Sequence, residues 1–312
     1  MILSVSRRTD IPTYYSEWFF NRIKEGVLYV RNPMNVHQVS KIDISPEVVD
    51  CIVFWTKNPA PMLDRLDELA SYPYYFQFTL TGYGKDMERS VPHKRDEMIP
   101  IFRKLSEKIG SKRVIWRYDP IIFTEKYTPE YHLKAFEQIA SALQGYTERC
   151  VISFVDIYAK NKKAMTQMGV YELGKPELTE FAKNISRMAR ENGMRIGSCA
   201  EGIDLEACGI EHNCCIDKAL IEDIIGCKLN GQKDKNQRPE CGCMESVEVG
   251  TYHTCKNGCL YCYANHSEDQ VAQNCGQYNP KSPILCSTIS ENDRITERKV
   301  GTLKELQLSL LE

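Results

Sequence analysis

Three cysteines near the end of the chain have the spacing of an iron–sulfur site. Cys255, Cys259 and Cys262 follow a C-x3-C-x2-C pattern, and Gly258 lets this stretch turn tightly so that the sulfurs converge. Three thiolates can bind three irons of a [4Fe–4S] cluster, whereas a cluster held entirely by protein uses a fourth cysteine. The triplet therefore predicts a cluster with one open iron, which is what a catalytic metal centre keeps for a substrate or cofactor.

The other cysteines are numerous and unevenly placed. The chain has 14 cysteines in 312 residues, and only Cys51 and Cys150, each at the start of an apolar run, precede residue 199. The short N-terminal apolar stretch does not resemble a signal peptide, and no apolar run approaches the roughly 20 residues of a membrane span. We therefore expect a cytoplasmic protein without membrane association, in which so much cysteine indicates metal or redox chemistry rather than disulfides.

Composition and charge are those of an ordinary globular protein. Apolar residues make up 42% and charged residues 26%, and the net charge is −2. This balance shows no basic excess, although a local groove for nucleic acid stays open as an alternative. A chain of 312 residues is long enough for one large α/β barrel.

The elements that must position the cysteines can be read from the hydrophobic pattern. Nearly continuous apolar runs, typical of strands buried on both faces, occur at residues 2–8, 51–57, 74–80, 113–118, 150–156 and 194–200. Amphipathic helices are expected at 61–70, 128–143 and 175–192. Repeated β-α units predict an α/β fold, a (β/α)6–7 partial or closed TIM-like barrel, although a doubly wound sheet is not excluded.

The chain divides into three segments of one structural domain. Residues 1–201 carry the β/α repeats, and residues 202–245 form an irregular segment whose polar stretch 233–239 reads as a linker. Residues 246–312 begin with an alternating strand, 246–252, that runs directly into the cysteine triplet. The tail after residue 290 is charged and is expected to be peripheral.

Polar clusters follow the predicted strands, where parallel α/β folds place their functional groups. They are Arg7-Arg8-Thr9-Asp10, Thr56-Lys57-Asn58-Pro59, Thr81-Gly82-Tyr83-Gly84 and Arg117-Tyr118-Asp119-Pro120. Together they indicate the wall of a site, in which Arg7, Arg8 and Arg117 meet a substrate carboxylate or phosphate through forked hydrogen bonds. The alternatives are solvated turns with helix caps, or ion pairs among these side chains.

The triplet, the aromatic Tyr261 before its last cysteine and the preceding strand resemble the cofactor-binding loop of the radical S-adenosylmethionine (SAM) superfamily. The resemblance implies a [4Fe–4S] cluster whose open iron is chelated by SAM. It also implies an electron donor such as flavodoxin or ferredoxin, and cleavage of SAM to a 5′-deoxyadenosyl radical that abstracts hydrogen from the substrate. Such a protein would be oxygen-sensitive. Small molecule, peptide and nucleic acid all remain open as substrates.

The position of the triplet differs from that superfamily, where it follows the first barrel strand. Here strand 246–252 would be that first strand, displaced to the end of the chain by circular permutation. The whole chain, with its SRRTDIP, TKNP, RYDPI, KDKNQR and CGC elements, resembles an uncharacterised bacterial family of permuted radical SAM proteins. More distantly, Phe54-Trp55-Thr56-Lys57 is similar to a strand of spore photoproduct lyase, which suggests a lyase or repair reaction.

This resemblance gives roles to individual residues. Lys57 is expected to reach the SAM carboxylate, with Asn58 and Tyr261 as further cofactor-binding residues. Asp10 and Asp119 are candidates for holding the SAM ribose or the substrate. The catalytic residues are not identified beyond these two and the three arginines.

A second cluster is the expected role of four other cysteines. Cys199, Cys215, Cys241 and Cys243 are candidates for an auxiliary [4Fe–4S] cluster of the kind that several radical SAM families carry. Two other functions stay open. Cys241, Cys243, Cys259 and Cys262 have the look of a four-cysteine zinc site in a structural or interaction protein, and an iron–sulfur electron carrier that does not use SAM is also possible.

Overall fold

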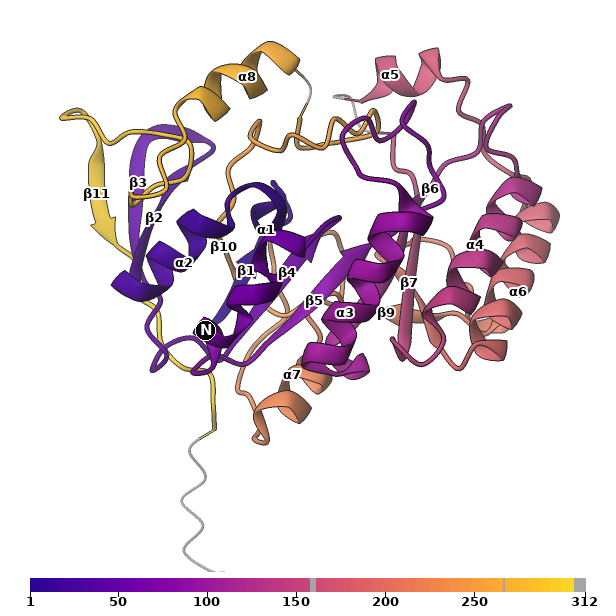
Figure 1. Ribbon diagram of the computed structural model, residues 1–312, viewed down its shortest axis with the longest axis horizontal. Helices are drawn as coiled ribbons and strands as arrows, with labels where there is room; N and C mark the ends of the chain where they lie inside the picture. Colours follow the sequence, from indigo (N-terminus) through magenta and orange to yellow (C-terminus); the bar gives the residue numbers. More distant parts are fainter. Residues whose placement is uncertain (158–160, 266, 306–312) are drawn as a thin grey trace, which may run out of the picture.

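A parallel eight-stranded sheet forms the centre of the computed structural model, which describes residues 1–157, 161–265 and 267–305 (Figure 1). The strand order is β10-β1-β4-β5-β6-β7-β8-β9, and every neighbouring pair is parallel. The bounds are β1 (Ile2–Val5), β4 (Cys51–Thr56), β5 (Tyr74–Thr79), β6 (Val114–Ile121), β7 (Arg149–Phe154), β8 (Arg195–Cys199), β9 (Glu211–Asn213) and β10 (Val247–Glu248). The six strands predicted before residue 201 are thus confirmed. Within the described ranges no pairing joins the edge strands β9 and β10.

Helices follow most of the strands. They are α1 (Ile11–Tyr14), α2 (Ser16–Glu25), η1 (Ala60–Leu69), η2 (Lys94–Met98), α3 (Ile99–Ile109), η3 (Ser111–Arg113), α4 (Pro129–Leu143), α5 (Lys162–Gln167), α6 (Lys175–Glu191), η4 (Glu206–Cys208), α7 (Lys218–Ile225) and α8 (Glu268–Gly276). The predicted helix at 61–70 is present as a 3-10 helix, η1. The Thr128 hydroxyl accepts from the amide of Tyr131 and starts α4, as its sequence predicts. In the described ranges no helix is long and apolar enough to cross a bilayer.

Both faces of the sheet are covered, which explains the continuous apolar runs. Ile52 and Phe54 of β4 belong to a core shared with α2, α3, α4 and α6, while Val53 faces the opposite side. There it belongs to a second core that contains residues of α7 and of the cysteine-containing segment, among them Leu220 and Cys241. Residues 215–244 of the irregular segment therefore cover the second face of the sheet, whereas Leu205, Cys208 and Ile210 belong to the first core.

A smaller sheet was not foreseen from the sequence. It has the order β11-β3-β2 and contains β2 (Val27–Asn32), β3 (Asn35–Asp43) and β11 (Arg294–Glu297). The tail expected to be peripheral supplies β11, which pairs in parallel with β3. This strand is short and mostly exposed, so its place depends on backbone hydrogen bonds that leave no apolar pattern in the sequence.

The two ends of the sheet-forming sequence lie side by side. Leu3 pairs with Val247 and Ser4 with Glu248, so β10 lies directly beside β1. The hydroxyl of Ser4 donates to the Glu248 carboxylate at 2.7 Å, and the amide of Arg7 donates to the same oxygen at 3.0 Å. The strand that leads into the cysteine triplet is therefore held by the first strand of the chain, although only two residues of the predicted 246–252 are strand.

A buried histidine joins α4 to the end of β6. His132 Nδ1 lies 2.9 Å from the Tyr118 hydroxyl and Nε2 lies 3.0 Å from the Ile122 carbonyl oxygen. Burial disfavours the charged ring and lowers the pKa of His132 to about 4. In the unfolded chain His132 binds a proton at its ordinary pKa, which is higher than its pKa in the folded protein. Below that ordinary pKa, protonation therefore favours the unfolded state, and His132 makes the folded protein less stable as the pH falls.

We expect the variant His132→Gln to lose less stability than the parent protein between pH 7 and pH 5. The contribution of His132 to that difference is about 2 kcal/mol, from the gap between its ordinary and its folded pKa. Urea unfolding at both pH values measures it. Phe136→Leu, at a buried and uncharged position of the same helix, serves as the control, because it should lose the same stability relative to the parent at both pH values. An equal drop in parent and His132→Gln would contradict the assignment.

Candidate functional site

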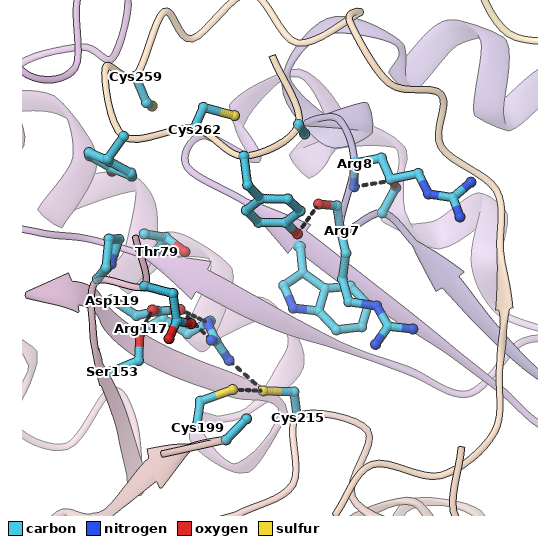
Figure 2. Close-up of a pocket in the computed structure, with 18 of the residues that line it drawn as sticks. Arg7, Arg8, Thr79, Arg117, Asp119, Ser153, Cys199, Cys215, Cys259 and Cys262 are labelled. Carbon is cyan, nitrogen blue, oxygen red and sulfur yellow. Dashed lines mark hydrogen bonds and ion pairs between the residues drawn. The ribbon is translucent and has the colours of Figure 1, made fainter. Parts of the chain in front are cut away.

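A cavity of about 460 Å³ opens at the carboxyl ends of the central strands (Figure 2). Its wall includes Thr56 at the end of β4, Asp119 of β6, Ser153 of β7 and Cys199 of β8, so the functional groups gather where a parallel sheet is expected to place them. Cys259 and Cys262 lie at one side of the cavity and Cys199 and Cys215 at the other in Figure 2. All three cysteines of the triplet and all four auxiliary candidates line this one space.

The N-terminal helices hold the cysteine loop in place. The Asn257 side chain, inside the triplet, donates to Asp10 at 3.0 Å and accepts from the Tyr14 hydroxyl at 2.9 Å. The Tyr15 hydroxyl donates to the carbonyl oxygen of Thr254 at 2.5 Å, directly before the first cysteine. Gly258 has φ +64°, a left-handed conformation that favours glycine. Hydrogen bonds with Asp10, Tyr14 and Tyr15 therefore fix the loop against the N-terminal segment.

The three thiols of the triplet are suited to bind a group that contains metal cations. Burial raises the pKa of Cys255, Cys259 and Cys262, that of Cys259 to about 12 even though Lys57 lies beside it. Three half-buried thiolates close together would be disfavoured without a cation, whereas bound iron supplies the positive charge that stabilises them. The donor set therefore fits an iron–sulfur cluster.

Asp10 has its carboxylate fully occupied by the protein. One oxygen accepts from the Thr13 amide at 3.1 Å, as N-cap of α1, and from the Thr56 hydroxyl at 2.8 Å. The other accepts from the Lys57 amide at 2.8 Å and from Asn257. Asp10 thus ties the end of β1 to the end of β4 and to the cysteine loop, which is a positioning role.

Lys57 belongs to a buried charge network that the sequence did not reveal. Its Nζ donates to Glu88 at 2.7 Å and to the Tyr261 hydroxyl at 3.0 Å. Glu88 is 1% exposed and also contacts Lys94, Tyr261 and Thr81. Burial alone would raise the pKa of Glu88, but the two lysines outweigh it and lower that pKa to about 2. The network links β4 to the aromatic residue of the cysteine loop.

Asn58 makes local hydrogen bonds and is not among the residues that line the cavity. Its side chain accepts from the Ala60 amide at 3.1 Å and its carbonyl oxygen accepts from the Thr13 hydroxyl at 2.8 Å. These bonds cap the turn into η1.

Arg117 and Asp119 form the ion pair that was the alternative to substrate binding. Arg117 Nε donates to the Asp119 carboxylate at 3.0 Å, and the other Asp119 oxygen accepts from Ser153. Arg117 Nη1 also donates to the sulfur of Cys215 at 2.7 Å. A buried cation therefore points at one of the auxiliary cysteines, where it favours a thiolate.

The four auxiliary candidates form a continuous group of sulfurs. Cys199 Sγ lies 3.1 Å from Cys215 Sγ, and Cys243, whose sulfur accepts from the Ile216 amide at 3.4 Å, interacts with both Cys215 and Cys241. The bond with Cys243 lowers the pKa of Cys241 to about 7. The neighbouring Cys214 lies against Gly242 instead. The sequence therefore selected four cysteines that the fold brings together.

The positions of the two cysteine groups can be compared with what a zinc site and an iron–sulfur cluster require. In the described residues no three His, Cys, Asp or Glu side chains converge on a point that could hold one ion. A zinc site needs four ligands about 2.0–2.3 Å from one ion, whereas each thiolate of a cubane binds a different iron. The two pairs of the four-cysteine zinc alternative also belong to different groups, because Cys243 contacts Cys215 while Cys259 lies beside Lys57.

The stretch that reads as a linker is part of the cavity wall. Asn236, Gln237 and Arg238 line the cavity, and Trp55 and Tyr263 join them. Arg7 lies over the Trp55 ring at 5.6 Å and its carbonyl oxygen accepts from the Tyr263 hydroxyl at 2.6 Å. A polar run without periodicity carries no sign of its partners, so the sequence could not distinguish a wall from a linker.

Removing the buried carboxylate of Glu88 should strongly destabilise the protein. Glu88→Ala leaves Lys57 and Lys94 buried without a counter-charge, which costs about 3–5 kcal/mol. Urea unfolding of the cluster-free protein measures the loss. Glu68→Ala is the control, since its partner Arg65 is more accessible and the change should cost at most about 1 kcal/mol. Equal losses in the two variants would refute a structural role for the network.

Comparisons with known proteins place this chain in a family. No curated protein and no solved structure matches it significantly. A family model described as "Domain of unknown function (DUF1848)" matches residues 2–264, a span that runs from β1 through the cysteine triplet and so contains the whole cavity. The chain belongs to the DUF1848 family.

Proposed function

We propose that this protein is a radical SAM enzyme. The observation that carries the proposal is a loop of three half-buried cysteines, with the triplet spacing, that faces a cavity at the carboxyl ends of a parallel sheet. When bound, a [4Fe–4S] cluster supplies one electron, received from a donor such as flavodoxin or ferredoxin. That electron would allow reductive cleavage of SAM to methionine and a 5′-deoxyadenosyl radical, which would abstract hydrogen from the substrate.

The residues around the loop have distinct tasks in this proposal. Cys255, Cys259 and Cys262 hold the cluster, and Asp10 fixes the loop through Asn257. Lys57 presents a buried positive charge to the SAM carboxylate while Glu88 and Tyr261 orient it. The chamber between the two cysteine groups leaves room for the substrate beside the reacting carbon.

A permuted partial barrel accounts for the order of the strands. With β10 taken as the first strand, the order β10-β1-β4-β5-β6-β7-β8 is that of consecutive parallel strands in a (β/α) barrel. The triplet then follows the first strand, as in the superfamily that it resembles. The pairing of β10 with β1 supports this arrangement.

We also propose that the second group of cysteines holds an auxiliary [4Fe–4S] cluster. Four sulfurs that follow one another in a chain of contacts, with Arg117 directed at Cys215, supply the ligands and the charge that such a cluster needs. A cluster held by these cysteines would lie across the cavity from the triplet, where it could contact the substrate or exchange an electron with it.

Anaerobically reconstituted protein should bind SAM in calorimetry and release 5′-deoxyadenosine when dithionite is added. The triple variant Cys255→Ala/Cys259→Ala/Cys262→Ala removes the ligands of the open cluster and should reduce product to background. The control is Cys208→Ala/Cys227→Ala, which removes two thiols outside both groups. Product from the triple variant would contradict the proposal, and clusters without SAM binding would indicate an electron carrier.

Iron analysis tests the auxiliary cluster separately. Parent protein should contain about eight irons, and each variant lacking one cysteine group, either the triplet or the set Cys199, Cys215, Cys241 and Cys243, about four, because each cubane holds four. The double variant above is again the control. Four irons in the parent, all lost with the triplet, would leave the second group without a cluster. Stoichiometric zinc in place of iron would favour the zinc alternative.

A further inference from the structure

A second cavity of about 500 Å³ adjoins the first. Arg7, Arg8 and Tyr263 line both spaces, as do Asn236 and Gln237 of the stretch that reads as a linker. Its outer wall comes from the small sheet, through residues of β2 and β3, and from Arg298 just after β11. The small sheet thus completes a second chamber beside the cysteine-lined one.

The second chamber is positively charged in a chain that is negative overall. Four arginines line it, Arg7, Arg8, Arg31 and Arg298, against two acids, Asp234 and Glu248. Their sum is a formal +2, while the whole chain carries −2. Such a local excess attracts anions into a chamber with few competing negative groups.

Ion pairs occupy two of the four guanidinium groups that line the second chamber, and the other two are left to bind a ligand. Arg7 takes up both acids, with 3.6 Å to Glu248 and 4.0 Å to Asp234. Arg31 forms an ion pair with Asp293 at 2.6 Å. In the described ranges neither Arg8 nor Arg298 forms an ion pair with a carboxylate. The attraction of the chamber therefore rests on these two.

Arg8 is held in place with most of its donors unused. Its guanidinium lies 4.8 Å from the centre of the Tyr252 ring, and one nitrogen donates to the Gly250 carbonyl oxygen at 3.4 Å. A guanidinium has five N–H donors in a planar fork that matches phosphate and carboxylate oxygens. Stacking on the ring reduces the conformational freedom that binding would otherwise remove.

We propose that the second cavity is an anion subsite for the substrate, which is a small molecule bearing a phosphate or carboxylate group. Arg8 and Arg298 bind that group, and the rest of the molecule passes Tyr263 and Gln237 into the cysteine-lined cavity. The assignment to a substrate rests on the proposed function. A chamber of about 500 Å³ fits one compact group, whereas nucleic acid would need a basic surface that meets several phosphates.

Residue-resolved modification with phenylglyoxal tests the subsite in the cluster-free protein. Inorganic phosphate or malonate, compared with sodium chloride at equal ionic strength, should slow modification of Arg8 and Arg298 in mass spectrometry. Arg187, an exposed helix residue paired with Glu191, is the internal control and should react at one rate throughout. Protection by phosphate alone indicates a phosphate ester, and protection by malonate alone a carboxylic acid.

The proposal is overturned if neither anion protects Arg8, if Arg187 is protected equally, or if only an oligonucleotide protects. In calorimetry, Arg8→Gln should weaken binding of the protecting anion about tenfold, the effect of one charged hydrogen-bond partner, while Arg187→Gln leaves it unchanged. SAM cleavage without anion protection would defeat this proposal alone. Protection without SAM cleavage would establish the anion site and defeat the proposed function.

Discussion

The arrangement of the site depends on the hydrogen bonds that the Asp10 carboxylate accepts. It accepts hydrogen bonds from the first turn of α1, from Thr56 and the Lys57 amide at the end of β4, and from Asn257 in the cysteine loop. Three segments far apart in sequence therefore share one buried acceptor. If this carboxylate were removed, the buried Lys57 amide and Asn257 side chain would lose their acceptor, which would lower the free energy of unfolding. The position of the cysteine loop thus depends on residues from the other end of the family match.

Each of the two cysteine groups in the cavity lies beside buried, positively charged side chains. Lys57 and Lys94 exceed the single carboxylate of Glu88 by one positive charge close to Cys259. Across the cavity Arg117 is shared between Asp119 and Cys215. Each cysteine group therefore has a cation at hand, an arrangement that tolerates negatively charged iron–thiolate clusters. The arginines of the second chamber extend this positive character toward the outside.

Much of the fold was predictable because its strands are buried on both faces and leave continuous apolar runs. Those at 51–57 and 74–80 are examples, and the two cores lie on either side of them. The small sheet was not predictable, because β11 is an exposed strand of four residues held by backbone pairing with β3. Its role in forming the second chamber was missed for the same reason.

The site itself was predictable in its cysteines and less so in its charged residues. The spacing of the triplet and the clustering of Cys241 and Cys243 are local in sequence, and the fold brings each to the cavity. Glu88 lies in a polar stretch that resembles a solvated turn, and only the tertiary structure buries it between two lysines. Asp10 and Arg117 were identified as polar residues after strands, but whether such a residue meets a ligand or another side chain depends on distant neighbours.

The central claim is that the triplet loop holds a cluster whose open iron binds SAM. Electron–nuclear double resonance of the dithionite-reduced protein, with SAM carrying ¹⁵N in its amino group, tests this most directly. We predict a hyperfine coupling between the reduced cluster and that nitrogen, lost when Cys255, Cys259 and Cys262 are replaced by alanine. A reduced-cluster signal in the parent protein without coupling to labelled SAM would contradict the account.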